Sequence, residues 1–156
     1  MRVRVIAVGT RMPAWVRSAC EDYLRRLDAH LNVSIVEIEP GARTAGGVVD
    51  KAIATETKRL LTVLRPGEHV VALDERGTQF STRELATWLA SRKQAGADLA
   101  LLIGGPDGFA PEVLARSDAR WSLSKLTLPH ALARVVLAEQ LYRAQSILAN
   151  HPYHRD

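Results

Sequence analysis

Short apolar runs alternate with amphipathic stretches along this chain, and that alternation constrains the fold more than any other feature. Runs with strand character lie at Arg2–Val8, Val33–Ile38, Val70–Leu73, Leu99–Ile103 and Arg120–Ser124. Apolar residues at helical spacing predict helices from about Pro13, over Val49–Leu64, from Ser81 to about Lys93, and from Pro129 onward. Strands separated by helices form a parallel sheet that is covered on both faces. We therefore expect an α/β fold, with residues 1–156 forming one domain.

Local signals mark where individual helices and loops begin and end. The run Ser81-Thr82-Arg83-Glu84 matches a capping box and starts the third helix. The pair Pro66-Gly67 ends the second helix. Three glycines between Pro40 and Gly47 predict a mobile loop after the second strand.

Composition restricts the compartment and the partners of the chain. No apolar run approaches the roughly 20 residues that cross a bilayer, and the alternating N-terminus is unlike a signal peptide. Cys20 is the only cysteine, so an internal disulfide framework is excluded and a reducing cytoplasm is expected. The net charge is +4, and residues 1–30 carry six arginines against three acidic residues. This excess favours a polyanionic partner, although basic helices are often only solvated faces.

Two segments after predicted strands are suited to grip a ligand by its main chain. The strand Leu99–Ile103 runs into Gly104-Gly105-Pro106-Asp107-Gly108, and Trp121–His130 follows seventeen residues after the start of that turn. Glycine lets the backbone approach a ligand closely, and proline fixes the shape of a loop. Both segments would meet Leu73 at the carboxyl edge of the sheet, where α/β folds bind ligands. Two ordinary strand-to-helix turns remain an alternative interpretation.

The sequence lacks the motifs of several common classes of nucleotide-binding protein and enzyme. The three glycines of the turn do not fit G-x-G-x-x-G, and no Lys-Ser or Lys-Thr follows for a P-loop. The serine-hydrolase elbow G-x-S-x-G and the zinc motif H-E-x-x-H are also missing. His151 and His154 lack cysteine or clustered histidine partners, so we expect no metal site.

The last seven residues concentrate side chains that suit a nucleotide. Asn150–Asp156 holds two of the five histidines together with Tyr153 and Arg155. Tyrosine stacks on bases, arginine binds phosphate and histidine titrates near neutral pH. A frayed terminus is the ordinary alternative for such a tail.

Five segments together resemble the ribosomal large-subunit methyltransferase H family over essentially the whole length. They are Ala7–Pro13, Glu21–Arg26, Leu102–Gly108, Trp121–His130 and Asn150–Arg155. The resemblance implies the SPOUT fold, in which the C-terminal segment threads a trefoil knot, a very rare topology. It also implies a homodimer that binds S-adenosyl-L-methionine (SAM) in the knot loops. Such an enzyme methylates N3 of a pseudouridine in 23S rRNA within an intact ribosome.

The same resemblance assigns roles to residues of this chain. The cofactor contacts would be Leu73, Gly104, Gly105, Leu123, Ser124, Lys125, Leu126, Thr127 and Leu128. The tail residues Tyr153, His154 and Arg155 would lie near the target nucleotide. Arg143 and Arg155 are candidates for stabilising charge, and His154 is the leading candidate for the base. For His130 a structural role, capping the loop before the last helix, is preferred over catalysis.

Two other functions remain open from the sequence. A SPOUT methyltransferase could act on tRNA or on another rRNA nucleotide, although one compact domain offers few contacts to a small free RNA. A non-catalytic RNA-binding module with a decayed cofactor pocket is the second alternative. Binding of SAM separates the enzyme from the module.

Overall fold

The computed structural model describes residues 1–27, 31–44 and 48–155. Within these ranges five strands form one sheet in the order β2-β1-β4-β3-β5, and every neighbouring pair is parallel. The strands are β1 (Arg2–Val8), β2 (Asn32–Ile38), β3 (His69–Gln79), β4 (Leu99–Ile103) and β5 (Ala119–Ser122). The helices are α1 (Ala14–Arg26), α2 (Val49–Val63), α3 (Thr82–Ala95), α4 (Pro111–Arg116) and α5 (His130–Leu148).

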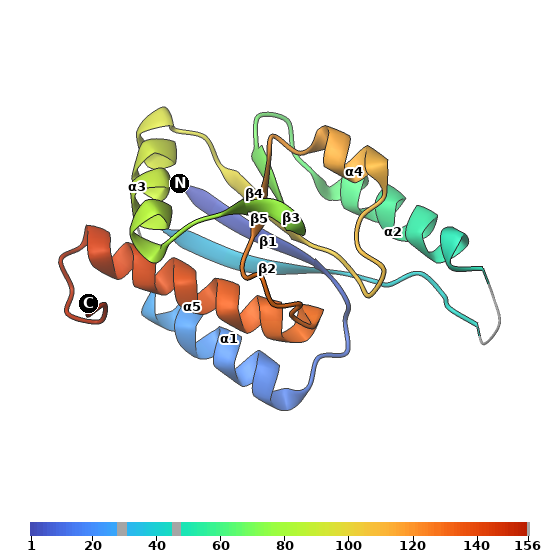
Figure 1. Cartoon of the computed structure of the whole chain (residues 1–156), viewed down its shortest axis with the longest axis horizontal. Helices are drawn as coiled ribbons and strands as arrows, with labels where there is room; N and C mark the ends of the chain where they lie inside the picture. Colours follow the sequence, from blue (N-terminus) through green and yellow to red (C-terminus); the bar gives the residue numbers. More distant parts are fainter. Residues whose placement is uncertain (28–30, 45–47, 156) are drawn as a thin grey trace.

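Helices cover both faces of the sheet, as the alternation predicts. Figure 1 shows α1 and α5 side by side on one face together with α3, whereas α2 and α4 lie on the other face. The central strand β4 is buried along its whole length. Its Leu99, Leu101 and Ile103 pack toward α3 and α5, and Ala100 and Leu102 belong to the cluster on the opposite face. The prediction of a parallel α/β sheet is confirmed.

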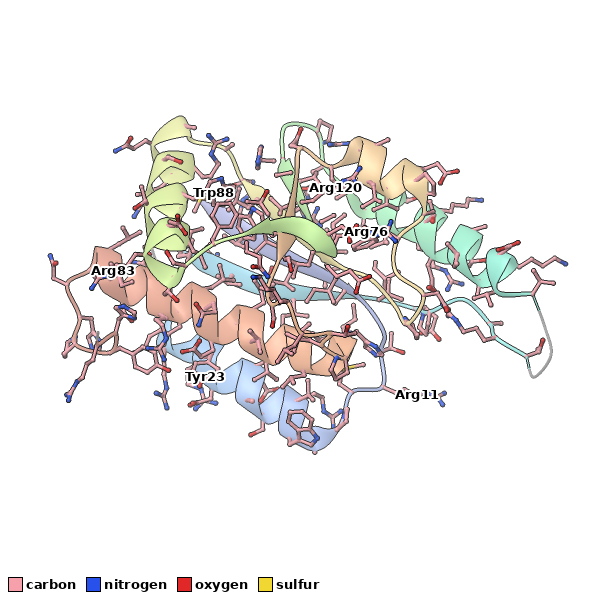
Figure 2. The ribbon with its side chains drawn as sticks, in the orientation of Figure 1. Arg11, Tyr23, Arg76, Arg83, Trp88 and Arg120 are labelled. Atoms are coloured by element: carbon pink, nitrogen blue, oxygen red, sulfur yellow. The ribbon has the colours of Figure 1, made fainter. Side chains whose placement is uncertain are left out.

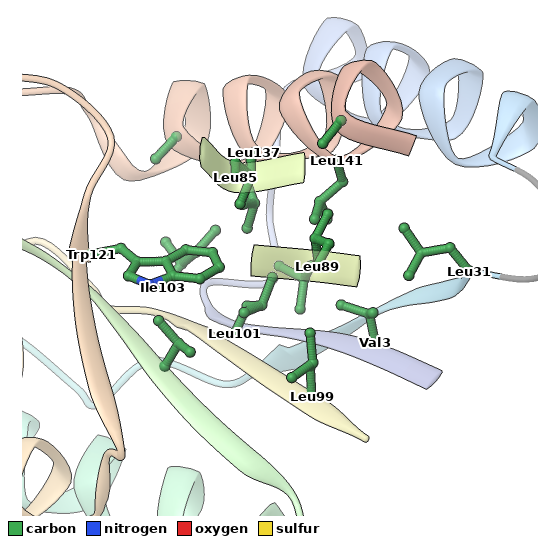
Figure 3. Close-up of a cluster of buried hydrophobic side chains, with 14 of the residues drawn as sticks. Val3, Leu31, Leu85, Leu89, Leu99, Leu101, Ile103, Trp121, Leu137 and Leu141 are labelled. Atoms are coloured by element: carbon green, nitrogen blue, oxygen red, sulfur yellow. The ribbon is translucent and has the colours of Figure 1, made fainter. Parts of the chain in front are cut away.

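Leucines from two helices pack against this sheet in the core. Leu85 and Leu89 of α3 and Leu137 and Leu141 of α5 meet Leu101 of β4 (Figure 3). Each leucine side chain that is fully removed from water contributes about 1.5–3 kcal/mol before entropy is counted. The core therefore fixes the position of α5, the helix that begins beside the carboxyl edge of the sheet.

Three local features differ from the sequence prediction. The strand β3 continues through Gln79 instead of ending at Leu73, with an irregularity in its pairing to β5 between Leu73 and Thr78. Gly77 permits this close crossing, because a Cβ there would lie 2.5 Å from the Trp121 carbonyl carbon. The strand β5 ends at Ser122 instead of Ser124, and the short helix α4 was not predicted.

Polar interactions fix the strand and helix ends. The capping box is confirmed: the Glu84 amide donates to the Ser81 hydroxyl, and the Ser81 amide donates to the Glu84 carboxylate at 2.7 Å. Buried Arg4 donates twice to the Glu68 carboxylate, at 2.7 and 2.6 Å. Of the predicted loop Pro40–Gly47, residues 45–47 lie outside the described residues.

Candidate active site

The carboxyl edge of the sheet brings the two predicted ligand-binding segments together. In the sheet register Leu73 pairs with Ile103 on β4 and with Trp121 on β5. The turn 104–108 and the loop 123–128 therefore leave β4 and β5, the two strands that flank β3, at the same level. The geometry places Leu73 between the two segments.

Two adjoining cavities lie between these segments and the start of α5. The larger, about 550 Å³, is lined by Leu73, Gly104, Gly105, Thr127 and Leu128, among others. The smaller, about 120 Å³, is lined by Leu73, Leu123, Ser124, Leu126, Thr127 and Leu128, among others. Eight of the nine residues predicted to contact the cofactor thus line one or both cavities. Lys125 lines neither of them.

The turn after β4 is closed by its own backbone. The Gly108 amide donates to the Gly105 carbonyl at 3.1 Å, and Gly108 has a φ of +73°, which favours glycine. At Gly105 an added Cβ would lie 3.0 Å from a Glu56 carboxylate oxygen and 3.2 Å from a Val8 methyl carbon. The small residue at this position therefore also serves packing against β1 and α2.

Serine hydroxyls shape the loop after β5. The Ser122 hydroxyl donates to the Ser124 carbonyl at 2.9 Å, and the Leu126 amide donates to the Ser124 hydroxyl at the same distance. These bonds fold the loop tightly and leave Leu126 76% exposed. An exposed leucine on a loop that lines a cavity is available to an incoming ligand.

A network of ion pairs that the sequence did not predict holds the turn 104–108 in place. The Glu56 carboxylate is 4% exposed and accepts hydrogen bonds from Arg43 at 2.9 and 3.0 Å. Arg43 also pairs with Asp107 of the turn at 2.9 Å. A glutamate within an amphipathic helix gives no signal that distinguishes it from a solvent-facing one, so only the fold shows this role.

His130 begins α5 and lies beside the cavities. The N-cap residue of α5 is Pro129, whose side chain makes no capping hydrogen bond, and the structural role of His130 in this loop stays a prediction. His130 lines the 550 Å³ cavity and a neighbouring cavity at the ends of β1 and β2. Burial and the nearby Arg134 guanidinium lower the pKa of His130, which favours a neutral imidazole at neutral pH.

The tail packs against α5 instead of extending into solvent. The Tyr153 ring meets the Tyr142 ring at 4.6 Å between centroids and lies 4.7 Å from the Arg143 guanidinium carbon. Its hydroxyl donates to the Glu139 carboxylate at 3.2 Å, and Glu139 also pairs with Arg143 at 2.6 Å. Burial, a hydrogen bond with Tyr23 and the charge of Glu139 raise the pKa of Tyr153 to about 12. We call Glu139, Arg143 and Tyr153 the tail cluster.

The tail cluster and the two cavities lie at different places along α5. His130 opens the helix beside the cavities, and Arg143 lies about 20 Å further along, at 1.5 Å per residue. Figure 1 shows the C-terminus at the opposite end of α5 from the loop that precedes this helix. Within one chain, the structure does not bring the predicted catalytic residues to the predicted cofactor residues. His154 is half-buried in the tail, and Arg155 is exposed.

Comparison with known proteins identifies the family of this chain. The family model described as "Predicted SPOUT methyltransferase" matches residues 1–154. The chain belongs to the SPOUT methyltransferase family. It is 52% identical over 155 residues to a ribosomal RNA large subunit methyltransferase H of Chromohalobacter salexigens, covering 99% of this chain and 100% of the relative. A protein of the same description from Thiobacillus denitrificans is 49% identical over 156 residues, with both chains covered completely.

Solved structures share the fold at low sequence identity. A probable methyltransferase from Bordetella pertussis Tohama I aligns with a TM-score of 0.59 at 17% identity, covering 92% of this chain and 94% of that one. A probable methylase family protein from Haemophilus influenzae Rd KW20 aligns with a TM-score of 0.57 at 15% identity, covering 99% and 70%. Family membership makes the chain a methyltransferase, which needs a methyl donor.

The described residues hold neither a metal-binding cluster nor a membrane-spanning helix. No group of three or more histidine, cysteine, aspartate or glutamate side chains there is placed to hold a metal ion. No helix in the same part of the chain is long and apolar enough to span a bilayer.

Proposed function

We propose that this methyltransferase transfers the methyl group of SAM to N3 of a pseudouridine in 23S rRNA within the assembled ribosome. The observation that carries the proposal is the cavity pair at the sheet edge, in a chain related over its full length to ribosomal RNA large subunit methyltransferase H proteins. We place this activity in the cytoplasm, where ribosomes work. A trefoil knot in the C-terminal segment is part of the same proposal.

The residues around the larger cavity fit SAM. Leu73 and Leu128 offer apolar surface for an adenine ring, and the backbone of Gly104, Gly105 and Thr127 offers amides and carbonyls for its polar edges. About 550 Å³ lies within the usual size range for a small-molecule site. When bound, SAM supplies a methyl group on a positively charged sulfur: the N3–C bond forms as the C–S bond breaks, and S-adenosylhomocysteine leaves.

The protein has to align the nucleophile and assist loss of its proton. Alignment of reacting groups supplies several kcal/mol without any covalent help. The imide N3–H must ionise, which costs about 2.7 kcal/mol if its pKa lies two units above the ambient pH. In the proposal Arg143 and Arg155 stabilise the resulting negative charge, and His154 accepts the proton. Glu139 orients Arg143 and Tyr153 by the contacts of the tail cluster.

In a homodimer, the tail cluster of one copy can lie near the cavity of the other copy. Leu132 and Val136 lie four residues apart on α5, are half-buried, and pack in none of the three clusters of buried side chains among the described residues. Glu139 and Arg143 continue the same face of the helix, by helical spacing. A second copy docked on this face would place its tail cluster near the first copy's cavity. We therefore propose a composite site built by two chains.

Removing the tail tests this proposal. A variant that lacks Tyr153–Asp156 should bind SAM within a few-fold of the full chain, because Tyr153, His154 and Arg155 line neither cavity. Its methylation of ribosomes should fall by at least about a hundredfold, or roughly 2.7 kcal/mol of barrier. The assay is transfer of tritiated methyl from SAM to purified ribosomes that lack the modification. A variant that lacks only Asp156 is the matched control.

Several outcomes would contradict the proposal. Near wild-type turnover by the truncated chain would make the tail an ordinary terminus. Faster methylation of free 23S rRNA than of ribosomes would exclude the assembled ribosome as the substrate. Mass spectrometry of digested product should identify 3-methylpseudouridine, and methyl on another nucleotide or on tRNA would favour the alternative target. No SAM binding at millimolar concentration would favour the non-catalytic module.

A further inference from the structure

A cavity of about 700 Å³ adjoins the proposed cofactor cavity. It is formed by Val8 at the end of β1 and residues 9–12 after it, residues 39–43 after β2, Arg59 of α2, Pro106 of the turn and His130. Pro106 and His130 also line the 550 Å³ cavity, so one wall separates the two spaces. A methyl acceptor must approach the donor from a neighbouring space, and this cavity provides one.

The lining of this cavity carries more positive than negative charge. Three arginines, Arg11, Arg43 and Arg59, face one glutamate, Glu39. Two of the arginines are engaged by the protein: Arg43 pairs with Glu56 and Asp107, and Arg59 donates to the Glu39 and Pro40 carbonyls at 2.7 and 3.1 Å. Both stabilise the loop that forms the cavity wall.

Arg11 is the exception among the three. Its side chain is exposed and has no hydrogen bond or ion pair within the described part of the chain. Figure 2 shows it pointing away from the fold. A guanidinium that the protein does not use keeps its donors for an incoming anion, and its planar fork matches a phosphate.

The backbone that carries Arg11 is nevertheless fixed. Arg134, 3% exposed, donates to the Gly9 carbonyl at 2.7 Å and pairs with Glu37 of β2 at the same distance. The Thr10 hydroxyl donates to the Glu39 carboxylate at 3.2 Å. A free cationic side chain on a held loop loses less entropy on binding than one on a mobile loop.

We propose that this cavity receives the target nucleotide of the rRNA, with Arg11 binding a backbone phosphate at its mouth. The inference rests on the proposed function and adds the place where the RNA strand enters. His130 lies on the wall between nucleotide and methyl donor, because it lines both cavities. Arg11 acts as a positioning residue, since it holds the strand and takes no part in the transfer itself.

The test compares three variants for ribosome binding and for methylation. Arg11→Gln should weaken cosedimentation with ribosomes and raise the KM for ribosomes by at least about tenfold, with kcat and SAM affinity within about twofold. The slope of log kcat/KM against log salt should become shallower by about 0.7–0.9, the value for one lost phosphate contact. Arg11→Lys should keep the wild-type slope. Arg116→Gln, an exposed arginine at the opposite edge of the sheet, should match wild type.

Binding and turnover together decide each outcome. Wild-type KM, binding and salt slope in Arg11→Gln would overturn the inference and leave the proposed function intact. An equal loss in Arg116→Gln would assign the effect to net charge and would also overturn it. If the wild-type chain binds ribosomes in a manner that depends on Arg11 yet transfers no methyl, the proposed function fails and the phosphate contact stands. If it neither binds nor methylates ribosomes, both fail.

Discussion

Glu56→Gln should destabilise the protein, because Glu56 is the centre of the network beneath the proposed cofactor cavity. The carboxylate accepts from both terminal nitrogens of Arg43, at 2.9 and 3.0 Å, and from the Gly41 amide at 3.3 Å. Glutamine keeps the size but brings an amide NH₂ against one of these donors. Hydrogen bonds to charged groups contribute about 1.5–3 kcal/mol each, and Arg43 is 27% exposed, so water recovers part of the loss. We expect a cost of about 2 kcal/mol.

Urea unfolding at one fixed protein concentration measures this cost. With a slope of about 2 kcal/mol per molar urea, the midpoint should fall by about 1 M. The control is Asp107→Asn, which removes only the 2.9 Å pair between Arg43 and a 38% exposed carboxylate and should cost less than about 1 kcal/mol. A Glu56→Gln midpoint within about 0.2 M of wild type would refute the reasoning.

Three further predictions concern pH, cofactor and assembly. Burial alone would raise the pKa of Glu68, but the ion pair with Arg4 and a backbone hydrogen bond outweigh it and hold this pKa below its ordinary value. The stabilisation that ionised Glu68 gives to the folded state is thus complete above the ordinary glutamate pKa, and it is lost as the pH falls through the lowered pKa of Glu68. The urea midpoint of the wild type should fall over this pH range, and Glu68→Gln should lose this part of the pH dependence. Leu128→Ala should lower the affinity for SAM about tenfold in titration calorimetry, because it removes roughly 1–2 kcal/mol of apolar contact. The control Leu61→Ala, in the groove between α2 and α4, should leave this affinity unchanged. EDTA should have no effect on SAM binding. Sedimentation at micromolar concentration should show a dimer, and a 17.2 kDa monomer would contradict the composite site.

Much of the fold could be predicted because local patterns and tertiary packing agree. The strand Leu99–Ile103 has the predicted limits, since an apolar run of this length suits a strand buried on both faces. The capping box at Ser81 needs only four residues and forms as predicted. Helix α4 was missed because six residues are too few to show helical spacing. The second half of β3 was missed because its polar residues, from Asp74 onward, look like a loop.

The candidate site was predictable only where backbone shape determines it. Glycines and prolines indicated the turn after β4, and the sheet register then placed Leu73 beside it. Glu56 contacts Arg43 from a different segment of the chain, and Glu139 contacts Tyr153 beyond the end of its helix. No local sequence pattern predicts such contacts. The separation between the tail cluster and the cavities also depends on how α5 lies on the sheet. It is visible only in three dimensions.

Mixing two inactive variants tests the composite methyltransferase site most directly. One variant lacks Tyr153–Asp156, and the other carries Thr127→Trp, which fills the cavity that Thr127 lines. Each alone should fail to methylate ribosomes, while subunit exchange should restore about one quarter of wild-type activity, since half of the randomly mixed dimers hold one intact site. Restored methyl transfer that depends on SAM is the predicted result. A mixture that stays as inactive as its components, although sedimentation shows that the subunits have exchanged, would contradict the account.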